Sequence, residues 1–201
     1  FIVLGLFGPK SYQVERSISI AATPDMIWPH MNSLKKVNEW SPFLKEDPDA
    51  VVEYSGNDGE VGSKSTWSSK KMGKGEQSIT AIEPMKSSMV HLKFFMPWGV
   101  GESDGYLTLE PDSAGTKVTW GMKGNNDFIG RAMGAVMSKD KNVGPFFERG
   151  LADLKAKVDA DPKEPKMGMN YQINSGQFPG GKYLAVHKTM QMSDISDFFM
   201  K

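Results

Sequence analysis

The chain has 201 residues, and its 24 basic and 24 acidic side chains give a formal net charge of zero. A protein that binds nucleic acid normally carries a basic surplus that neutralises phosphates, so we expect no nucleic-acid partner for this domain. The chain contains no cysteine, which excludes disulfides, thiolate nucleophiles and thiolate metal ligands.

Residues 1–10 begin with a short apolar segment, Phe1 to Phe7, which is followed by Gly8-Pro9-Lys10. The segment is too short to span a bilayer, which takes about 20 residues. It fits either the remnant of a removed hydrophobic anchor or signal, or an edge strand. The Gly-Pro pair marks a boundary before the main domain. Two locations therefore stay open: the cytoplasm, or a membrane reached through an upstream anchor.

The first elements of the main domain are predicted to be a strand and two short helices. Residues Tyr12 to Ala21 alternate between apolar and polar side chains, which is typical of a half-buried strand. Thr23-Pro24-Asp25 then gives a helix start, with a capping threonine, a proline at the first helical position and an acidic residue at the positive end of the dipole. A second short helix is predicted from about Ser33 through Trp40, and Pro42 ends it.

Strand-like sequence dominates the middle of the chain. The predicted strands are Val51–Tyr54, Lys64–Lys70, Gln77–Glu83, Ser88–Phe95, Gly105–Glu110 and Thr116–Lys123. Turn sequences such as Pro111-Asp-Ser-Ala-Gly115 separate them. Connections this short predict antiparallel pairing, because a parallel neighbour would need a long crossover.

Helical patterns return after the strands. Residues Phe128 to Met137 favour a small apolar helix, and residues Pro145 to Val158 have apolar side chains at helical spacing with charged ones between them. Pro145 either starts this amphipathic helix or kinks a longer helix that begins near Ile129. A sheet that curls around the one apolar face of this helix, with a cavity between the two, is the arrangement that the whole pattern predicts.

A charged, proline-bearing linker at residues 161–166 separates the main domain, residues 11–160, from a tail at residues 167–201. The tail has two strand-like segments, Met169 to Ile173 and Lys182 to Met190, and then the first turns of a helix. A piece this small cannot bury a core of its own. We expect it to dock on the main domain, to form a homodimer with another tail, or to begin a second domain.

Several short motifs follow one another in a fixed order over the main domain. They are Ile18-x-Ile20, Ala22-Thr-Pro24, Ile27-Trp28, Trp40-Ser-Pro42, Gly62, Trp67, Gly73-Lys-Gly75, Pro84, Phe95-x-Pro97, Leu109-x-Pro111, Gly115-Thr-x-Val-Thr-Trp120 and Gly150-Leu-x-x-Leu154-Lys155. In this order they resemble the START/Bet v 1-like (SRPBCC) superfamily, in particular its bacterial polyketide cyclase/dehydrase-like branch.

The resemblance implies an α+β helix-grip fold of one strand, two helices, six strands and a final helix. In this fold a curved antiparallel sheet wraps around the long C-terminal helix and leaves a hydrophobic cavity beneath it. The resemblance implies no single activity, because the superfamily includes lipid carriers, hormone receptors and cyclases.

The tail also resembles a known domain. Tyr183-Leu-Ala-Val186, Met190 and Asp194-Ile195 are similar to the opening of a GyrI-like effector-binding domain, of the kind attached to some transcription regulators. This likeness implies that the natural protein is longer and couples two ligand-binding modules.

Aromatic and sulfur-containing side chains are the candidates for the cavity wall. The candidate ligand-binding residues are Trp40, Phe43, Trp67, Phe95, Trp98, Tyr106, Trp120, Met122, Met133, Met137, Phe147 and Leu151. Trp120 shares a strand face with Met122 and is expected to face the closing helix. Trp98 lies in an apolar loop that could rim the cavity. Core packing and a solvated sheet surface are the ordinary alternatives for these residues.

Strong catalytic motifs are absent from the sequence: there is no nucleophile elbow, no phosphate-binding glycine loop and no His-Glu-x-x-His pair. The histidines, His30, His91 and His187, are too scattered to suggest a metal site. We therefore expect no metal and no cofactor.

Three residues are candidates for acid–base chemistry: His91, Tyr106 and Glu110. His91 shares strand parity with Lys93, whereas Val90 and the alternate residues after it form the obvious inward face. We expect His91 on the outside, unless a bulge shifts the register and turns it into the cavity. Tyr106 could offer the cavity one hydrogen bond.

The favoured function is binding of a small hydrophobic molecule, such as a lipid, a polyketide or an aromatic compound, by a carrier or sensor. A cyclase or dehydratase acting on such a molecule is the first alternative. A regulatory protein whose second domain binds an effector is the other.

Overall fold

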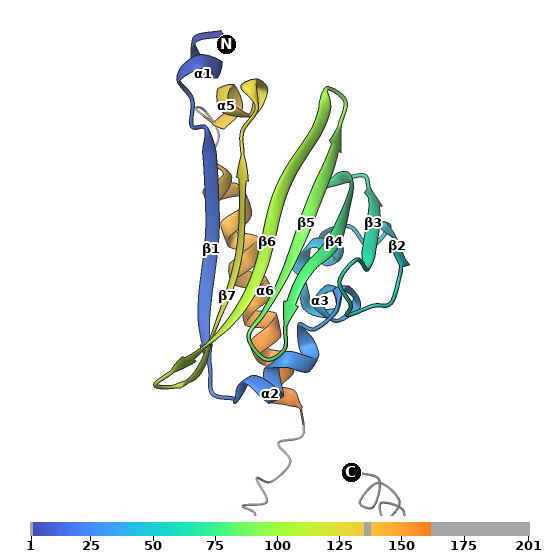
Figure 1. The fold of residues 1–201 in the computed structure, drawn as a ribbon, viewed down its shortest axis with the longest axis vertical. Helices are drawn as coiled ribbons and strands as arrows, with labels where there is room; N and C mark the ends of the chain where they lie inside the picture. The colour runs from blue at the N-terminus through green and yellow to red at the C-terminus, as the bar shows by residue number, and fades with distance from the viewer. Residues whose placement is uncertain (1, 135–137, 162–201) are drawn as a thin grey trace, which may run out of the picture. The chain divides into compact units, whose positions relative to one another are not determined.

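The computed structural model describes residues 2–134 and 138–161, and its centre is a seven-stranded antiparallel sheet (Figure 1). The strands are β1 (Ser11–Ile20), β2 (Val51–Ser55), β3 (Lys64–Ser69), β4 (Gly73–Glu83), β5 (Ser87–Met96), β6 (Gly99–Asp112) and β7 (Gly115–Asn125). Their order in the sheet is β1-β7-β6-β5-β4-β3-β2. The predicted meander is confirmed.

Two strands begin earlier than the sequence predicted, β4 at Gly73 and β6 at Gly99. Both glycines have a positive φ, 72° for Gly73 and 149° for Gly99, which L side chains rarely adopt. Each glycine directly follows the turn residues, 70–72 and 97–98, and starts the new strand, so the hairpin connections are shorter than expected.

Four short helical elements connect β1 to β2. They are α2 (Pro24–Ile27), the 3-10 helix η1 (Trp28–His30), α3 (Leu34–Trp40) and α4 (Pro42–Glu46). Ser33 caps α3, and its Oγ accepts a hydrogen bond of 3.3 Å from the backbone N–H of Lys36. Pro42 ends α3 as predicted, but it also starts α4, which was not predicted. The fixed φ of proline suits a first helical turn as well as it breaks a preceding one.

The helix α6 (Lys139–Ala160) lies across one face of the sheet (Figure 1). It begins at Lys139, before Pro145 but well after Ile129, and α5 (Phe128–Gly134) is a separate helix. Pro145 therefore lies inside a longer helix and does not start it, but that helix begins at Lys139 and not near Ile129. Gly144 directly before Pro145 has no Cβ for the proline ring to meet, which relieves the usual restriction on that position.

Arg16 is the charged residue that interrupts the apolar alternation of β1, and it joins this strand to α6. Its Nε lies 2.5 Å from Glu148 Oε1, and its Nη1 lies 2.8 Å from Asp140 Oδ1. The hydrogen bond from Arg16 lowers the pKa of the Asp140 carboxyl below its usual value. The interruption is explained by two carboxylates that α6 places opposite the edge strand.

The hydrophobic core fills the space between the sheet, α6 and the helices after β1. Its buried members include Ile20, Ile27, Met31, Trp40, Leu109, Val118, Leu151, Leu154 and Val158. Leu151, Leu154 and Val158 lie on the predicted inner face of α6, which is confirmed. The fold predicted from the sequence, a curved sheet that grips its last helix, is the fold of the protein.

Gly150 lies where α6 packs closely against Trp120 of the sheet and Pro42 of α4. A Cβ at this position would overlap the ring of Trp120 and would lie 2.9 Å from Pro42 Cδ. We expect Gly150→Ala to lower the free energy of unfolding by about 2 kcal/mol, because overpacking against two rigid rings costs about 3 kcal/mol and alanine regains about 1 kcal/mol of helix propensity. Urea denaturation followed by circular dichroism measures the change.

The matched control for this substitution is Gly144→Ala in the same helix. A Cβ there would overlap Arg16 Nη2, the end of a flexible side chain that can move aside. Alanine at position 144 regains about 1 kcal/mol of helix propensity but meets the ring of Pro145, so the free energy of unfolding is expected to change by no more than about 1 kcal/mol in either direction. Equal stability of the two variants would contradict the close packing inferred at Gly150.

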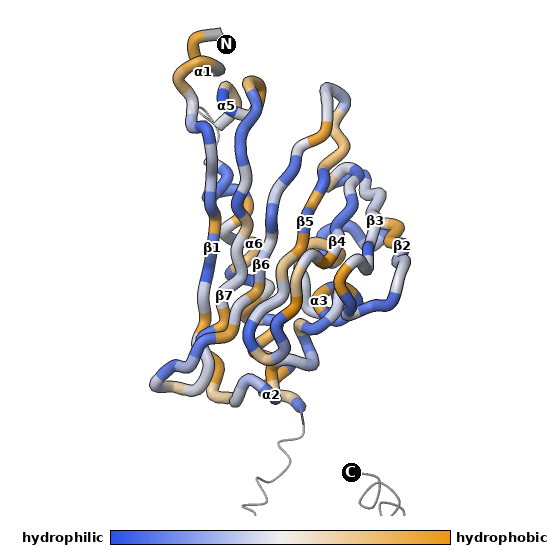
Figure 2. Tube along the Cα trace, viewed as in Figure 1, coloured by the Kyte–Doolittle hydropathy of each residue, from blue (hydrophilic) through white to orange (hydrophobic). Residues whose placement is uncertain are grey.

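The apolar segment at the start of the chain forms the helix α1 (Ile2–Phe7), not the edge strand that was one alternative. It is mostly hydrophobic (Figure 2) and packs against α5. Arg131 of α5 holds it by donating from Nη2 to the Leu6 carbonyl at 2.6 Å. No helix within residues 2–134 and 138–161 is both long enough and apolar enough to cross a membrane. An upstream anchor stays a prediction.

The predicted tail lies outside the described residues. Its strands at 169–173 and 182–190, the helix start after them and the likeness to an effector-binding domain therefore stay predictions. The same holds for the linker at 161–166 as a domain boundary and for a homodimer formed through the tail.

Candidate ligand-binding cavity

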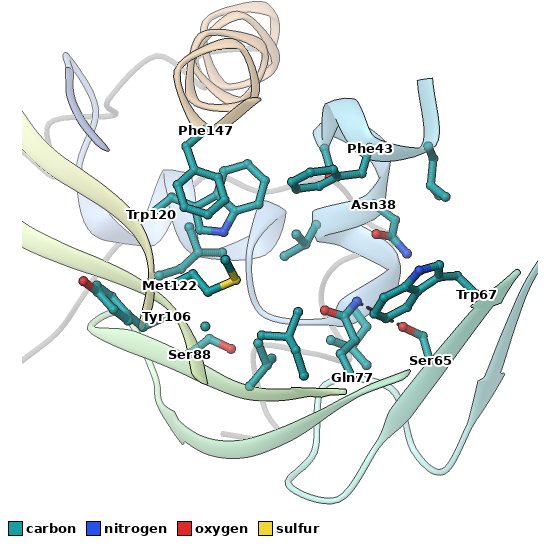
Figure 3. A pocket seen from close by; sticks show the side chains of 18 of the residues that line it. Asn38, Phe43, Ser65, Trp67, Gln77, Ser88, Tyr106, Trp120, Met122 and Phe147 are labelled. Carbon is teal, nitrogen blue, oxygen red and sulfur yellow. Dashed lines mark hydrogen bonds between the residues drawn. The ribbon is translucent and has the colours of Figure 1, made fainter. Parts of the chain in front are cut away.

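A cavity of about 240 Å³ lies between the sheet and the helices α3, α4 and α6 (Figure 3). Every wall contributes apolar side chains. They are Leu34, Val37, Phe43, Leu44, Val52, Trp67, Met72, Val90, Leu92, Phe94, Leu107, Trp120, Met122, Val143 and Phe147. The cavity is therefore a space in which hydrophobic surface can be removed from water.

Aromatic rings from three elements form the wall beneath α6 (Figure 3). Trp120 of β7 stacks on Phe147 of α6, with ring centroids 4.5 Å apart. Phe43 of α4 meets Trp120 edge to face at 6.0 Å, and Trp40 supports the same indole from the core side at 5.0 Å. These are favourable geometries for aromatic pairs. Trp120 faces the closing helix, as its strand parity predicted.

Trp67 of β3 stands on the opposite side of the cavity. Its ring meets Phe94 of β5 at 5.8 Å, with the two planes 69° apart. Gly75 of the neighbouring strand lies directly beneath Trp67, and a Cβ there would overlap the indole and lie 2.5 Å from the Lys93 carbonyl. The second glycine of the Gly73-Lys-Gly75 motif thus makes room for one wall of the cavity.

The alternation of β5 supplies the floor. Val90, Leu92 and Phe94 line the cavity, whereas His91 lies on the other face with its Nδ1 2.9 Å from Asp104 Oδ1. A register irregularity does occur between β4 and β5, at Ile79, but it leaves His91 outside. The expectation for this strand is confirmed.

Polar side chains interrupt the apolar lining at Ser33, Asn38, Ser41, Ser65, Gln77 and Ser88. Gln77 of β4 donates from Nε2 to Oγ of Ser65 on β3 at 3.0 Å. Ser65 is almost completely buried, and Ser88 on β5 is only 7% exposed. Both serines and Gln77 are lining residues. The sequence analysis missed Gln77 and Ser88.

The side-chain functional groups of the three acid–base candidates all lie on the outer face of the sheet. The Tyr106 hydroxyl donates to Glu15 Oε2 at 2.7 Å and accepts from Gln13 Nε2 at 2.9 Å, on the outer face of the sheet. Burial raises the pKa of Tyr106, and the Glu15 carboxylate raises it further. The exposed Glu110 has a carboxylate oxygen 3.6 Å from Lys117 Nζ.

These positions follow from strand parity. Tyr106 is among the lining residues, but its side chain alternates with the inward Leu107 and lies over Gly121 on the outside. The hydrogen bond that Tyr106 was expected to offer the cavity is therefore made elsewhere. His91 and Glu110 have the same outward parity on their own strands.

The aromatic and methionine candidates divide into three groups. Phe43, Trp67, Trp120, Met122 and Phe147 line the cavity, and their contact with a ligand stays a prediction. Trp40 and Leu151 are buried in the core instead and are not lining residues. Phe95, Trp98 and Met133 are exposed and do not line it, because they lie on the outer face of β5, in the β5–β6 turn and on α5. Met137 lies outside the described residues.

Several lining residues were missed by the sequence analysis. Leu44 belongs to α4, which was not predicted, so no signal identified it. Leu34 and Val37 lie on the apolar side of α3, and Val90, Leu92 and Phe94 were assigned to the inward face of their strand without being named as ligand contacts. The periodicity that marked these faces as buried was the available signal.

One unusual ionisable group lies outside the cavity, at the start of α6. Burial lowers the pKa of Lys139 to about 8. Its Nζ lies 2.8 Å from Asn126 Oδ1 and 3.4 Å from the centre of the Tyr12 ring.

In the part of the chain that the structure describes, no three histidine or carboxylate side chains gather where a metal ion could be held.

The curved sheet, the gripped helix and the apolar cavity between them define a helix-grip protein of the START/Bet v 1-like superfamily. Residues 11–159 match the model of one family within it, described as polyketide cyclase / dehydrase and lipid transport. The match covers most of the chain, and the chain belongs to this family.

Solved structures share the fold at low sequence identity. The crystal structure of CV1439 from Chromobacterium violaceum is 18% identical with a TM-score of 0.52, and the match covers 76% of this chain and 100% of that one. Norcoclaurine synthase from Thalictrum flavum is 12% identical with a TM-score of 0.58, over 80% and 92% of the two chains. Ara h 8.0201 is 12% identical with a TM-score of 0.55, over 75% and 99%. None of the curated proteins matches the chain.

Proposed function

We propose that this protein binds a small, largely hydrophobic molecule in the cavity beneath α6 and acts as a carrier or sensor. The observation that carries the proposal is the lining itself, which draws apolar side chains from α3, α4, α6 and the sheet. Empty apolar space forfeits dispersion contacts that a bound molecule would restore. An apolar cavity of about 150 Å³ accommodates benzene, so a cavity of about 240 Å³ suits a molecule of one or two rings or a short chain.

Binding without turnover is the function that the geometry supports best. The acid–base set that a cyclase or dehydratase would use, His91 with Tyr106 or Glu110, lies on the outer face of the sheet. General acid–base catalysis requires the proton-transferring group within hydrogen-bond reach of the substrate. The regulatory alternative rests on residues 167–201, which lie outside the described residues.

Naphthalene is a suitable first probe, because it is apolar and has two rings. We expect the thermal unfolding midpoint of the protein to rise with naphthalene concentration, since a ligand that binds only the folded state stabilises it. The fluorescence of Trp67 and Trp120, which line the cavity, should change over the same concentration range. The proposal fails if neither signal changes up to the solubility limit of naphthalene.

A further inference from the structure

We propose that the cavity selects uncharged molecules that carry one hydrogen-bonding group, and that Gln77 receives that group. This inference rests on the proposed function and adds the chemical class of the ligand. Two independent features of the lining carry it: the placement of charged groups and the placement of polar ones.

Charged side chains are absent from the lining within the described residues. Tyr106 is the one lining residue there with an ionisable side chain, and its hydroxyl is engaged by Glu15 and Gln13 on the outer face. A carboxylate, phosphate or ammonium group that entered the cavity would lose its hydration and find no opposite charge. The cavity therefore penalises an ionised ligand and accepts a neutral one.

The amide of Gln77 offers the ligand a hydrogen bond. One end of the amide is bonded to the Ser65 hydroxyl at 3.0 Å, and the other end faces the cavity (Figure 3). A serine hydroxyl both donates and accepts, so Ser65 can hold either the nitrogen or the oxygen of the amide. Gln77 can accordingly present a donor or an acceptor, and it suits a ligand hydroxyl or carbonyl equally.

Other polar groups border the same space. Among them are the hydroxyl of Ser88, a residue that is only 7% exposed, and the amide of Asn38, whose Nδ2 donates to the Tyr54 hydroxyl at 2.7 Å (Figure 3). Polar groups in an apolar wall cost free energy unless they are hydrogen-bonded. A ligand with one polar atom near Gln77 would offer these groups a hydrogen bond that a pure hydrocarbon does not.

Three probes with the same two-ring frame test the charge and the polar group separately. Naphthalene has neither, 2-naphthol has a hydroxyl, and 2-naphthoate has a carboxylate that is ionised at pH 7. Calorimetric titration of the whole chain should show 2-naphthol binding roughly 3- to 10-fold more tightly than naphthalene. It should show 2-naphthoate binding at least ~100-fold more weakly than naphthalene.

The variant Gln77→Met removes the amide and keeps an unbranched side chain of similar length. We expect it to bring the affinities for 2-naphthol and naphthalene to within about twofold of each other, since one hydrogen bond is lost and the apolar contacts remain. Gln13→Met is the matched control, because Gln13 also bonds a hydroxyl group but lies on the outer face. It should keep the wild-type preference. Gln77→Leu replaces the first variant if Gln77→Met does not fold.

The outcomes separate this inference from the proposed function. Binding of 2-naphthoate as tight as that of naphthalene would overturn the inference and leave hydrophobic ligand binding intact. So would a preference for 2-naphthol that survives in Gln77→Met. If none of the three probes binds, the proposed function fails, and the inference fails with it.

Discussion

Replacing Val90 with tryptophan is expected to weaken naphthalene binding by roughly 100-fold or more and to leave the fold intact. Val90 lines the floor of the cavity from β5, so an indole at this position would occupy the space of the ligand. A buried aromatic group removes on the order of 200 Å² from water, which is worth roughly 5 kcal/mol. Loss of about half of this amount corresponds to a factor of about 100 in affinity.

The control for this substitution is Met89→Trp, on the preceding residue of the same strand. Met89 is exposed on the outer face. The same bulky side chain there should leave the affinity for naphthalene unchanged. Isothermal titration calorimetry measures both affinities, and thermal denaturation checks that Val90→Trp is at least as stable as the wild type, as cavity-filling substitutions often are. Equal weakening in both variants would show that the probe does not bind in the cavity.

Replacing Trp40 with alanine should lower the free energy of unfolding by about 3–5 kcal/mol, the usual cost of deleting a buried aromatic ring. Trp40 is fully buried, with 0% of its surface exposed. Its ring lies 5.0 Å from that of Trp120, and its Nε1 donates to the His30 carbonyl at 2.8 Å. Because a domain is stable by only about 5–15 kcal/mol in total, this loss is a large fraction of the whole.

Trp98→Ala provides the matched comparison, because Trp98 is 53% exposed at the β5–β6 turn. Its truncation should change stability by no more than about 0.5 kcal/mol. Urea denaturation followed by circular dichroism gives both values. If the two tryptophan variants were equally stable, the buried position of Trp40 would be wrong.

The sequence predicted the sheet and its inward faces well, because strand alternation is a local property. On β5 the pattern separated Val90, Leu92 and Phe94 from His91, and the structure places them on opposite faces. The apolar face of α6 was predicted for the same reason. Where one residue has two local roles, the pattern was ambiguous: Pro42 ends one helix and starts the next, and only the end was predicted.

The cavity was harder to predict than the fold, because local periodicity does not say which buried residues face an empty space. Trp40 and Trp120 are both inward aromatic residues, but Trp40 is packed behind Trp120 and only Trp120 reaches the cavity. Gln77 is a polar residue on a strand and carries no sequence pattern that separates it from a solvated one. Its position depends on how far the sheet curves over α3 and α6, which is set by contacts far apart in the chain.

The position of Trp120 ties two properties together. Its indole borders the cavity and also touches Phe147 of α6 and the buried Trp40. A substitution at position 120 that changes the shape of the binding cavity will therefore also change how α6 packs against the sheet. Changing the ligand specificity through Trp120 therefore also changes the thermal stability of the protein. Gln77 and Val90 line the cavity from β4 and β5 and do not belong to this aromatic junction.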